Sequence, residues 1–377
     1  MSISARDADR NLERMVAPAA PRDRLLFLDG LRGFALVWMV LNHTGRWWMD
    51  GRMTWPRYHL IYVSMTLAAP LFLFLVGFCM PLAVRRPPAP AEALSLAKLA
   101  RRFVGRGLMV VLAGMLLNVV VFPAEPFWSW GVLQTIGLSL IALVPALWLL
   151  QYQAAAGLLL GAAAALYVGF SIVFERLVVW VEAHPHMAHL WFYEFPPLPW
   201  VSLPLVGLVL GWWWLDARAR SPAGERRYFA ACAVAGGALL AAFVALDWLV
   251  ATPLRFGLKR DFILNRHWVP RGLTLLWIFG TLLLLLAAHY FVIEVGGRRL
   301  HWLVILGQTA LFLYFIHQVV ALSLVNERLG WRFNRWDLFI LANAVLVASL
   351  VGFGRLWIAA RRLARRLWAP PGAPSIA

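Results

Sequence analysis

Ten long apolar runs, each about the length that a bilayer-spanning helix needs, constrain the fold of this chain more than any other feature of its sequence. The runs cover residues 27–45, 59–82, 102–122, 129–149, 154–175, 198–215, 228–250, 271–293, 301–323 and 337–359. Such a run predicts a transmembrane α-helix, because about 20 helical residues cross the hydrocarbon core with every backbone group satisfied internally. Hydrophobic residues make up 62% of the chain and charged residues 14%, which is unlike a soluble domain. We therefore expect an all-α, polytopic integral membrane protein with about ten transmembrane helices.

Lys and Arg residues are divided unequally between the segments that join these runs. If the N-terminus is cytoplasmic, most of the Lys and Arg residues outside the runs fall on the cytoplasmic side. The positive-inside rule therefore predicts that both termini are cytoplasmic. The net charge of +17 then reflects orientation and affinity for anionic lipid, and we expect no nucleic-acid partner.

The runs belong to one predicted domain, residues 24–360, between a disordered basic segment at 1–23 and a basic cytoplasmic tail at 361–377. The first run lacks a small-residue cleavage site behind it, so we interpret it as a retained helix and not as a signal peptide. Cys79 and Cys232 lie inside separate runs, which predicts neither a disulfide framework nor a metal site.

Arg32 and His43 lie in the first run with ten residues between them. At roughly 100° per residue, eleven steps return to within about 20° of the same helix face, and the two groups lie about 16 Å apart along the axis. An ionisable side chain near the bilayer centre costs at least about 2.5 kcal/mol, so we expect both to face a site enclosed by protein or filled with water.

Each residue of this pair also has a purely structural interpretation. Asp29 lies one helical turn before Arg32 and could form a local ion pair with it. Alternatively, the fork of donors on Arg32 suits a phosphate or a developing oxyanion. His43, beside Asn42, is either an interhelical hydrogen-bonding residue or a base that removes a proton from a hydroxyl or an amine.

Residues 28–33, LDGLRG, followed by His43, resemble the opening helix of the transmembrane acyltransferase superfamily, in which an Arg, ten residues and a His form the signature of the acyltransferase-3 proteins. Later segments are similar to the heparan-α-glucosaminide N-acetyltransferase-like branch and occur in the same order. These segments are residues 69–77, 131–137, 198–200 with Gly207 and Gly211, and 306–317. We interpret Gly77, Gly207 and Gly211 chiefly as sites of close helix packing.

The resemblance implies that residues 24–360 form an acyltransferase domain in a multi-pass protein of the bacterial inner membrane. Its donor would be cytosolic acyl-CoA, most often acetyl-CoA, without a metal, and its acceptor a sugar or glycan hydroxyl or amine on the outer side. By the motif match, His43 and Arg32 are candidate catalytic residues, with Asn42 and His317 as polarising or orienting groups. The donor would be bound by Arg32, Gln134 and Tyr314. A homo-oligomer is compatible with the sequence.

Two departures from the resemblance matter. The lysosomal-type enzymes carry a second histidine in a His-x-x-Trp-x-Gly stretch, which this chain lacks, although His59 lies in the corresponding region. That branch also tends to have Asn where this chain has His43. The histidine assignment therefore follows the acyltransferase-3 side, and heparan sulfate is not supported as a substrate.

An outer segment, residues 255–271, concentrates cationic, aromatic and amide side chains against the positive-inside trend. It is either a solvated loop or an acceptor site in which Asn265, Arg266, His267 and Trp268 contact a saccharide.

The rival function for the whole chain is a transporter or flippase for a glycolipid or small anion. Such proteins often show paired interrupted helices, which this sequence does not display.

Overall fold

A computed structural model of the chain describes residues 25–50, 67–84, 95–152, 154–187, 195–249 and 274–367. The elements are α2 (Leu26–Trp47), α4 (Ala68–Cys79), the 3₁₀ turn η1 (Pro81–Ala83), α5 (Leu96–Val121), α6 (Val132–Leu149), α7 (Ala155–Ala183), α8 (Pro185–Met187), α9 (Pro197–Trp200), α10 (Ser202–Arg220), α11 (Pro222–Leu249), α13 (Thr274–His289), the π-helix η3 (Tyr290–Val295), α14 (His301–Gln308), α15 (Ala310–Gln318), the π-helix η4 (Val319–Arg328) and α16 (Trp336–Leu367). Within the described ranges there is no β-strand, only an isolated bridge between Met49 and Phe333. The predicted all-α fold is confirmed.

Each predicted apolar run contains helix, and the multi-pass character of the protein is confirmed. Among the described residues, eight helical stretches are long and apolar enough to cross a membrane. They are α5, α6, α7, α9 with α10, α11, α13 with η3, α15 with η4, and α16. The other two predicted spans are α2, which carries charged residues, and the shorter apolar stretch Ala68–Ala83. Residues 59–66 of the second predicted span lie outside the described residues, and the cytoplasmic position of both termini stays a prediction.

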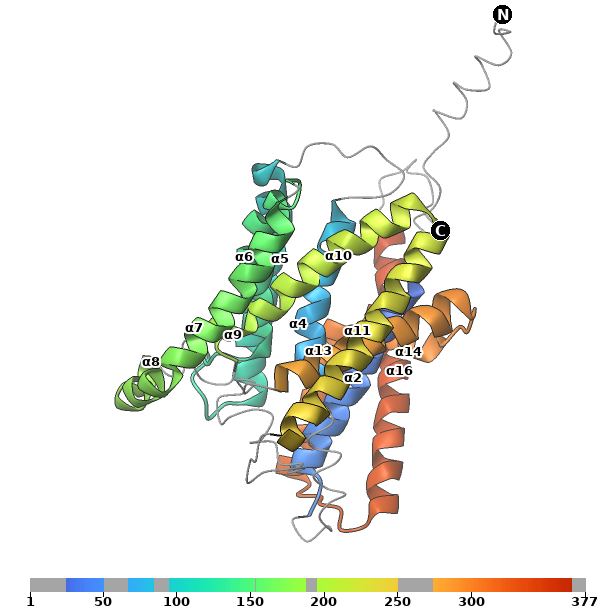
Figure 1. Cartoon of the computed structure of the whole chain (residues 1–377). Helices are drawn as coiled ribbons and strands as arrows, with labels where there is room; N and C mark the ends of the chain where they lie inside the picture. The colour runs from blue at the N-terminus through green and yellow to red at the C-terminus, as the bar shows by residue number, and fades with distance from the viewer. Residues whose placement is uncertain are drawn as a thin grey trace, which may run out of the picture.

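The helix bundle has two distinct ends (Figure 1). The corner between α10 and α11 and the end of α16 lie at the upper end, whereas the end of α2 and the start of α16 lie at the lower end. At the lower end the backbone N–H of Asp50 donates to the carbonyl oxygen of Phe333 over 2.9 Å. The first and last described helices therefore cross the bundle in opposite directions.

Pairs of helices in close contact form the bundle: α2 with α14, α4 with α10, α5 with α6, and α11 with α13. Glycine makes two of these approaches possible. A Cβ atom at Gly77 would collide with the backbone carbonyl of Pro204 on α10, and one at Gly307 with the carbonyl of Asp29 on α2. Gly207 and Gly211 face the backbone of α4 in the same way, so the close-packing interpretation of the motif glycines is confirmed.

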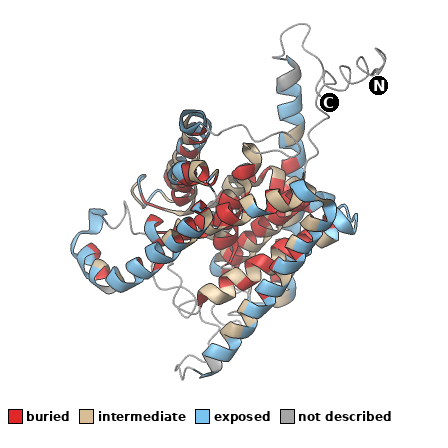
Figure 2. Cartoon of the chain, turned by 45° about the horizontal axis from the view of Figure 1, so that its top comes forward, coloured by how far each residue is buried: buried red, intermediate tan, exposed pale blue. Residues whose placement is uncertain are grey.

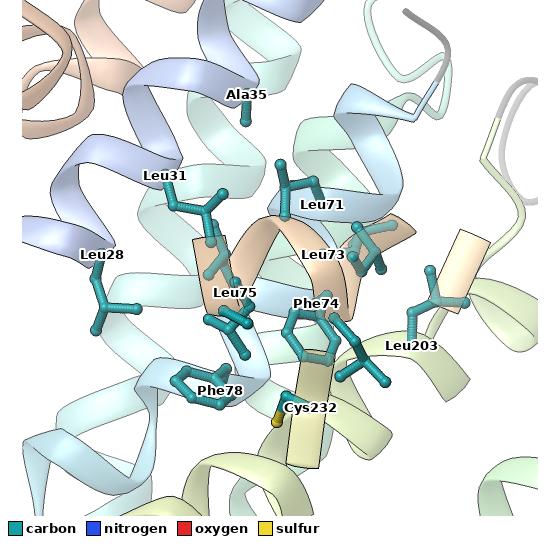
Figure 3. Packing of buried hydrophobic residues seen from close by; sticks show 14 of the residues in the cluster. Leu28, Leu31, Ala35, Leu71, Leu73, Phe74, Leu75, Phe78, Leu203 and Cys232 are labelled. Carbon is teal, nitrogen blue, oxygen red and sulfur yellow. The ribbon is translucent and has the colours of Figure 1, made fainter. Parts of the chain in front are cut away.

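The core lies where α2 and α4 meet α10, α11 and α13, and Figure 3 shows part of it. Phe27, at the start of α2, contacts Trp214, Phe229 and Tyr290 edge-on, with ring centroids 5.4 to 5.6 Å apart. Figure 2 shows buried residues concentrated at the centre and exposed residues along the peripheral helices. The exposed faces are rich in Leu, Val and Ile, as expected of helices that face lipid. The central position of α2 places its polar residues inside the protein.

Candidate active site

A cavity of about 430 Å³ lies between α2, α4, α5, α6 and α15. Arg32 lines it at the level of the first turns of α2, and Arg46 lines it at the last turn of the same helix. Aromatic side chains form much of the cavity wall: Trp47, Phe72, Phe122, Trp130, Phe195 and Tyr314. The helix rise between Arg32 and Arg46 is about 21 Å, so the cavity follows a large part of one membrane crossing.

One face of α2 supplies several of the polar groups of the cavity. Arg32, Asn42 and His43 all line it, together with Met39. Arg32 and His43 therefore line the same cavity, as their spacing on one helix face leads us to expect. The opposite face of α2 packs in the protein, where the Thr44 hydroxyl donates to Asn343 Oδ1 of α16 over 2.7 Å.

The Arg32 guanidinium has two protein partners and still reaches the cavity. Nη1 donates to Asp29 Oδ1 over 3.1 Å, and Nη2 donates to Cys79 Sγ over 3.0 Å. The Arg32 side chain keeps 33% of its surface exposed, whereas Asp29 keeps only 6%. The expected ion pair with Asp29 is present, and it holds the guanidinium in place without covering it.

His43 pairs with a histidine from the other end of the sequence. Its Nδ1 lies 2.9 Å from His317 Nε2, and the two ring planes are nearly parallel, with an interplanar angle of 8°. His317 is fully buried on α15, and its Nδ1 lies 3.1 Å from the carbonyl oxygen of Leu313. The two histidines predicted as site residues are thus brought together, with His43 on the cavity wall and His317 behind it.

The contacts of His317 assign the protons of the pair. A carbonyl oxygen only accepts, so His317 Nδ1 carries the hydrogen that is donated to Leu313. In a neutral imidazole the other nitrogen, Nε2, is then an acceptor, and His43 Nδ1 must be the donor to it. This leaves a lone pair on His43 Nε2, a nitrogen that makes no hydrogen bond to the described residues.

Gln318 adds a third group to the pair. Its side-chain amide nitrogen lies 3.2 Å from His43 Nδ1, and its Oε1 has no hydrogen-bond partner within the described residues. Turning the amide by 180° places Oε1 against the N–H of His43, where it shares the one hydrogen of Nδ1 with His317 Nε2 in a bifurcated hydrogen bond. The π-helix η4 begins directly after Gln318, and such irregular turns often accompany functional sites.

The other predicted site residues are placed as follows. Asn42 is buried beside His43 on the cavity wall, and Tyr314 lines the cavity with its ring edge-on to His317 at 5.5 Å. Gln134 also lines the cavity, but its Oε1 accepts from the N–H of Gly131 and its Nε2 donates to the carbonyl of Ser129. The Gln134 amide is therefore engaged in shaping the start of α6.

Two cavity residues escaped the sequence interpretation. Asn118, buried on α5, lines the cavity and donates to the carbonyls of Phe127 and Ser129. Gln318 follows His317 directly. Both are polar residues within apolar spans, and that signal could have identified them, since such side chains usually face the interior of a bundle.

The proposed acceptor residues Asn265, Arg266, His267 and Trp268 lie outside the described residues. Their role as a saccharide site therefore stays a prediction.

Comparison with known families gives one match. The family model described as heparan-alpha-glucosaminide N-acetyltransferase, catalytic, matches residues 24–246, which is more than half of the chain. The matched segment contains Arg32, Asn42, His43 and Gln134, but it ends before Tyr314 and His317. No curated protein gives a significant match.

Proposed function

This chain belongs to the heparan-alpha-glucosaminide N-acetyltransferase catalytic-domain family, and we propose that it moves an acetyl group from cytosolic acetyl-CoA to a sugar or glycan on the far side of the membrane. Family membership identifies the chain as a membrane acetyltransferase. The donor, the direction across the membrane and the acceptor class are the proposal. A location in the inner membrane of a bacterial cell is part of the same proposal.

The cavity-facing His43, hydrogen-bonded to His317, is the observation that carries this proposal. Acyl transfer to an amine or hydroxyl needs a base at the point where donor and acceptor meet. His43 Nε2 has a free lone pair, and His43 lies about 16 Å along α2 from Arg32. A donor entering at Arg32 and an acceptor entering beside Arg46 would meet near His43.

The polarity of the two ends of acetyl-CoA determines where each end can lie. The nucleotide end of CoA carries several negative charges and cannot enter hydrocarbon, whereas the uncharged pantetheine arm can thread a protein tunnel. Arg32 would contact the polar end of the arm, because its guanidinium is held in place by Asp29 and Cys79 but remains partly exposed. The cavity volume of about 430 Å³ is in the range of small-molecule sites.

The proposed chemistry is a direct transfer. The acceptor nitrogen or oxygen attacks the thioester carbonyl carbon while His43 Nε2 takes the acceptor proton. A carbon–nitrogen or carbon–oxygen bond forms, the carbon–sulfur bond breaks, and the leaving thiolate takes the proton from His43 to give free CoA. His317 Nε2 accepts the hydrogen bond from His43 Nδ1–H throughout and stabilises the imidazolium. Asn42 and Tyr314, which line the cavity, are candidate donors to the oxyanion.

The acceptor end of the cavity is aromatic. Trp47, Trp130 and Phe122 line it near Arg46, and aromatic faces of this kind suit the apolar faces of sugar rings. Residues 265–268 would extend this site. We do not carry the heparan-derived substrate in the family's name over to this chain.

Purified protein incubated with acetyl-labelled acetyl-CoA and a panel of amino sugars and glycans tests the function. We expect free CoA and acetylated product to appear in equal amounts with at least one acceptor, and His43→Ala to lower the rate of both about 100- to 10,000-fold. Movement of a glycolipid or anion across vesicles by the purified protein, with no CoA release for any acceptor, would instead establish the transporter alternative.

A further inference from the structure

A second hollow lies between α14 and α16 and shares no residue with the His43 cavity. It is an open groove of about 460 Å³. Arg355 and Arg362 lie on its α16 side two helical turns apart, and Gln308 lies on its α14 side. Its apolar lining includes Ile305 and Ile358. The groove thus combines two cations with an apolar floor.

The depth of this groove in the membrane follows from the charges on α16. Asp337 and Arg355 bracket a stretch without any charged residue, and the helix rise between them is about 27 Å. This distance matches the thickness of the hydrocarbon core, about 30 Å. Arg355 therefore lies near one hydrocarbon boundary, and Arg362 lies about 10 Å further along the helix, at the level of the lipid headgroups.

The cationic groups of the groove are not neutralised by the described part of the protein. Neither the Arg355 nor the Arg362 guanidinium has a hydrogen bond or ion pair to a residue that the structure describes, and both residues are exposed. Gly354 brings α16 against α14, because a Cβ there would contact Ile305 and Thr309. The close approach forms a shallow floor beside the two arginines.

We propose that this groove binds an anionic phospholipid. The headgroup phosphate lies between Arg355 and Arg362, the apolar part of the lipid next to the headgroup lies against Ile305 and Ile358, and an acyl chain continues past Arg355 toward the membrane centre. Guanidinium forks suit phosphate oxygens, and basic pockets between transmembrane helices are a known way of recognising lipid headgroups. A free phosphate would satisfy the arginines but leave the apolar floor uncovered, so the lipid is the occupant that fits both parts.

Lipid retention by the purified protein tests this site. The protein is reconstituted in vesicles of equal phosphatidylglycerol and phosphatidylcholine, extracted mildly, and its bound lipids are counted by native mass spectrometry. We expect wild type to retain phosphatidylglycerol preferentially. Arg355→Gln or Arg362→Gln should weaken retention about fivefold each, and the double variant about thirtyfold, since each basic residue near a membrane surface contributes on the order of 1 kcal/mol.

Arg361→Gln is the matched control, because Arg361 is an exposed neighbour of Arg362 that does not line the groove. It should retain phosphatidylglycerol like wild type. Equal retention of both lipids by wild type, or an equal loss in Arg361→Gln, would overturn the site in favour of diffuse attraction. Displacement of the lipid by millimolar inorganic phosphate would show a free-anion site instead, and this too would overturn the proposal. None of these outcomes depends on acetyltransferase activity.

Discussion

His43 Nδ1 and His317 Nε2 lie 2.9 Å apart although 274 positions separate the two residues in the chain. The hydrogen bond from His317 Nδ1 to Leu313 fixes which nitrogen of His317 accepts, and therefore which nitrogen of His43 is left with a lone pair. A histidine that orients another histidine performs the role that a carboxylate performs in a Ser-His-Asp triad, without adding a charge to the interior of the membrane. Replacing either histidine should therefore lower the rate of acetyl transfer.

Replacing His43 by Gln or Ala should lower turnover about 100- to 10,000-fold while acetyl-CoA still binds, because a positioned general base contributes a factor of that order. Turnover and donor affinity are measured separately, by product formation and by binding of labelled acetyl-CoA. A single-turnover reaction without acceptor distinguishes the competing covalent route. Accumulation of acetyl on His43 would contradict direct transfer, and near-full activity of both variants would remove His43 from the chemistry.

Replacing His317 by Phe should lower kcat about 10- to 100-fold with little change in KM, since the variant leaves the His43 N–H without its buried acceptor. Thr44→Val is the control. It breaks another buried hydrogen bond of α2, to Asn343, on the side away from the cavity, and should affect thermal stability without affecting kcat. If the two variants lose kcat equally, the effect of His317 comes from packing damage and not from orientation of His43.

Arg32→Lys should weaken acetyl-CoA binding about tenfold or more, because an ammonium keeps the charge but cannot contact Asp29, Cys79 and the donor together. Binding of labelled acetyl-CoA at equilibrium gives the affinity. Arg218→Lys is a matched change, since Arg218 is also a partly exposed arginine paired with an acid, Glu225, outside the cavity. It should leave affinity unchanged. Wild-type affinity and turnover in Arg32→Lys would show that Arg32 is a structural ion pair only.

Sequence periodicity was enough to predict the helices, because the bilayer imposes both their length and their apolar character. It was also enough to place Arg32 and His43 together, since both lie on one helix. The contact of His43 with His317 depends instead on the way α2 packs against α14 and α15, which no local pattern encodes. For the same reason the capping role of Gln134 was not foreseen: it depends on the turn before α6, where Ser129 and Gly131 bind the amide.

The orientation of the bundle gives a further prediction. A reporter fused after Pro370 should be active only in the form that reports the cytoplasm, because the basic segments favour cytoplasmic termini. A second reporter in the turn between α15 with η4 and α16, after Gly330, should report the opposite side. If both fusions report the same side, α16 does not cross the membrane and the predicted number of spans is wrong.

Close packing at Gly77 should determine the stability of the α4–α10 pair. A Cβ atom at this position would collide with the backbone carbonyl of Pro204, which cannot move aside as a flexible side chain can. Gly77→Ala should therefore destabilise the protein by about 1–3 kcal/mol or more, the usual effect of overpacking. Thermal unfolding of the purified protein in detergent measures the change.

Gly161→Ala is the matched control, because nothing lies within 4 Å of a Cβ at that helical glycine. Alanine there should be neutral or stabilise the helix by about 0.5–1 kcal/mol. Equal unfolding temperatures for the two variants would show that α4 and α10 do not pack through Gly77.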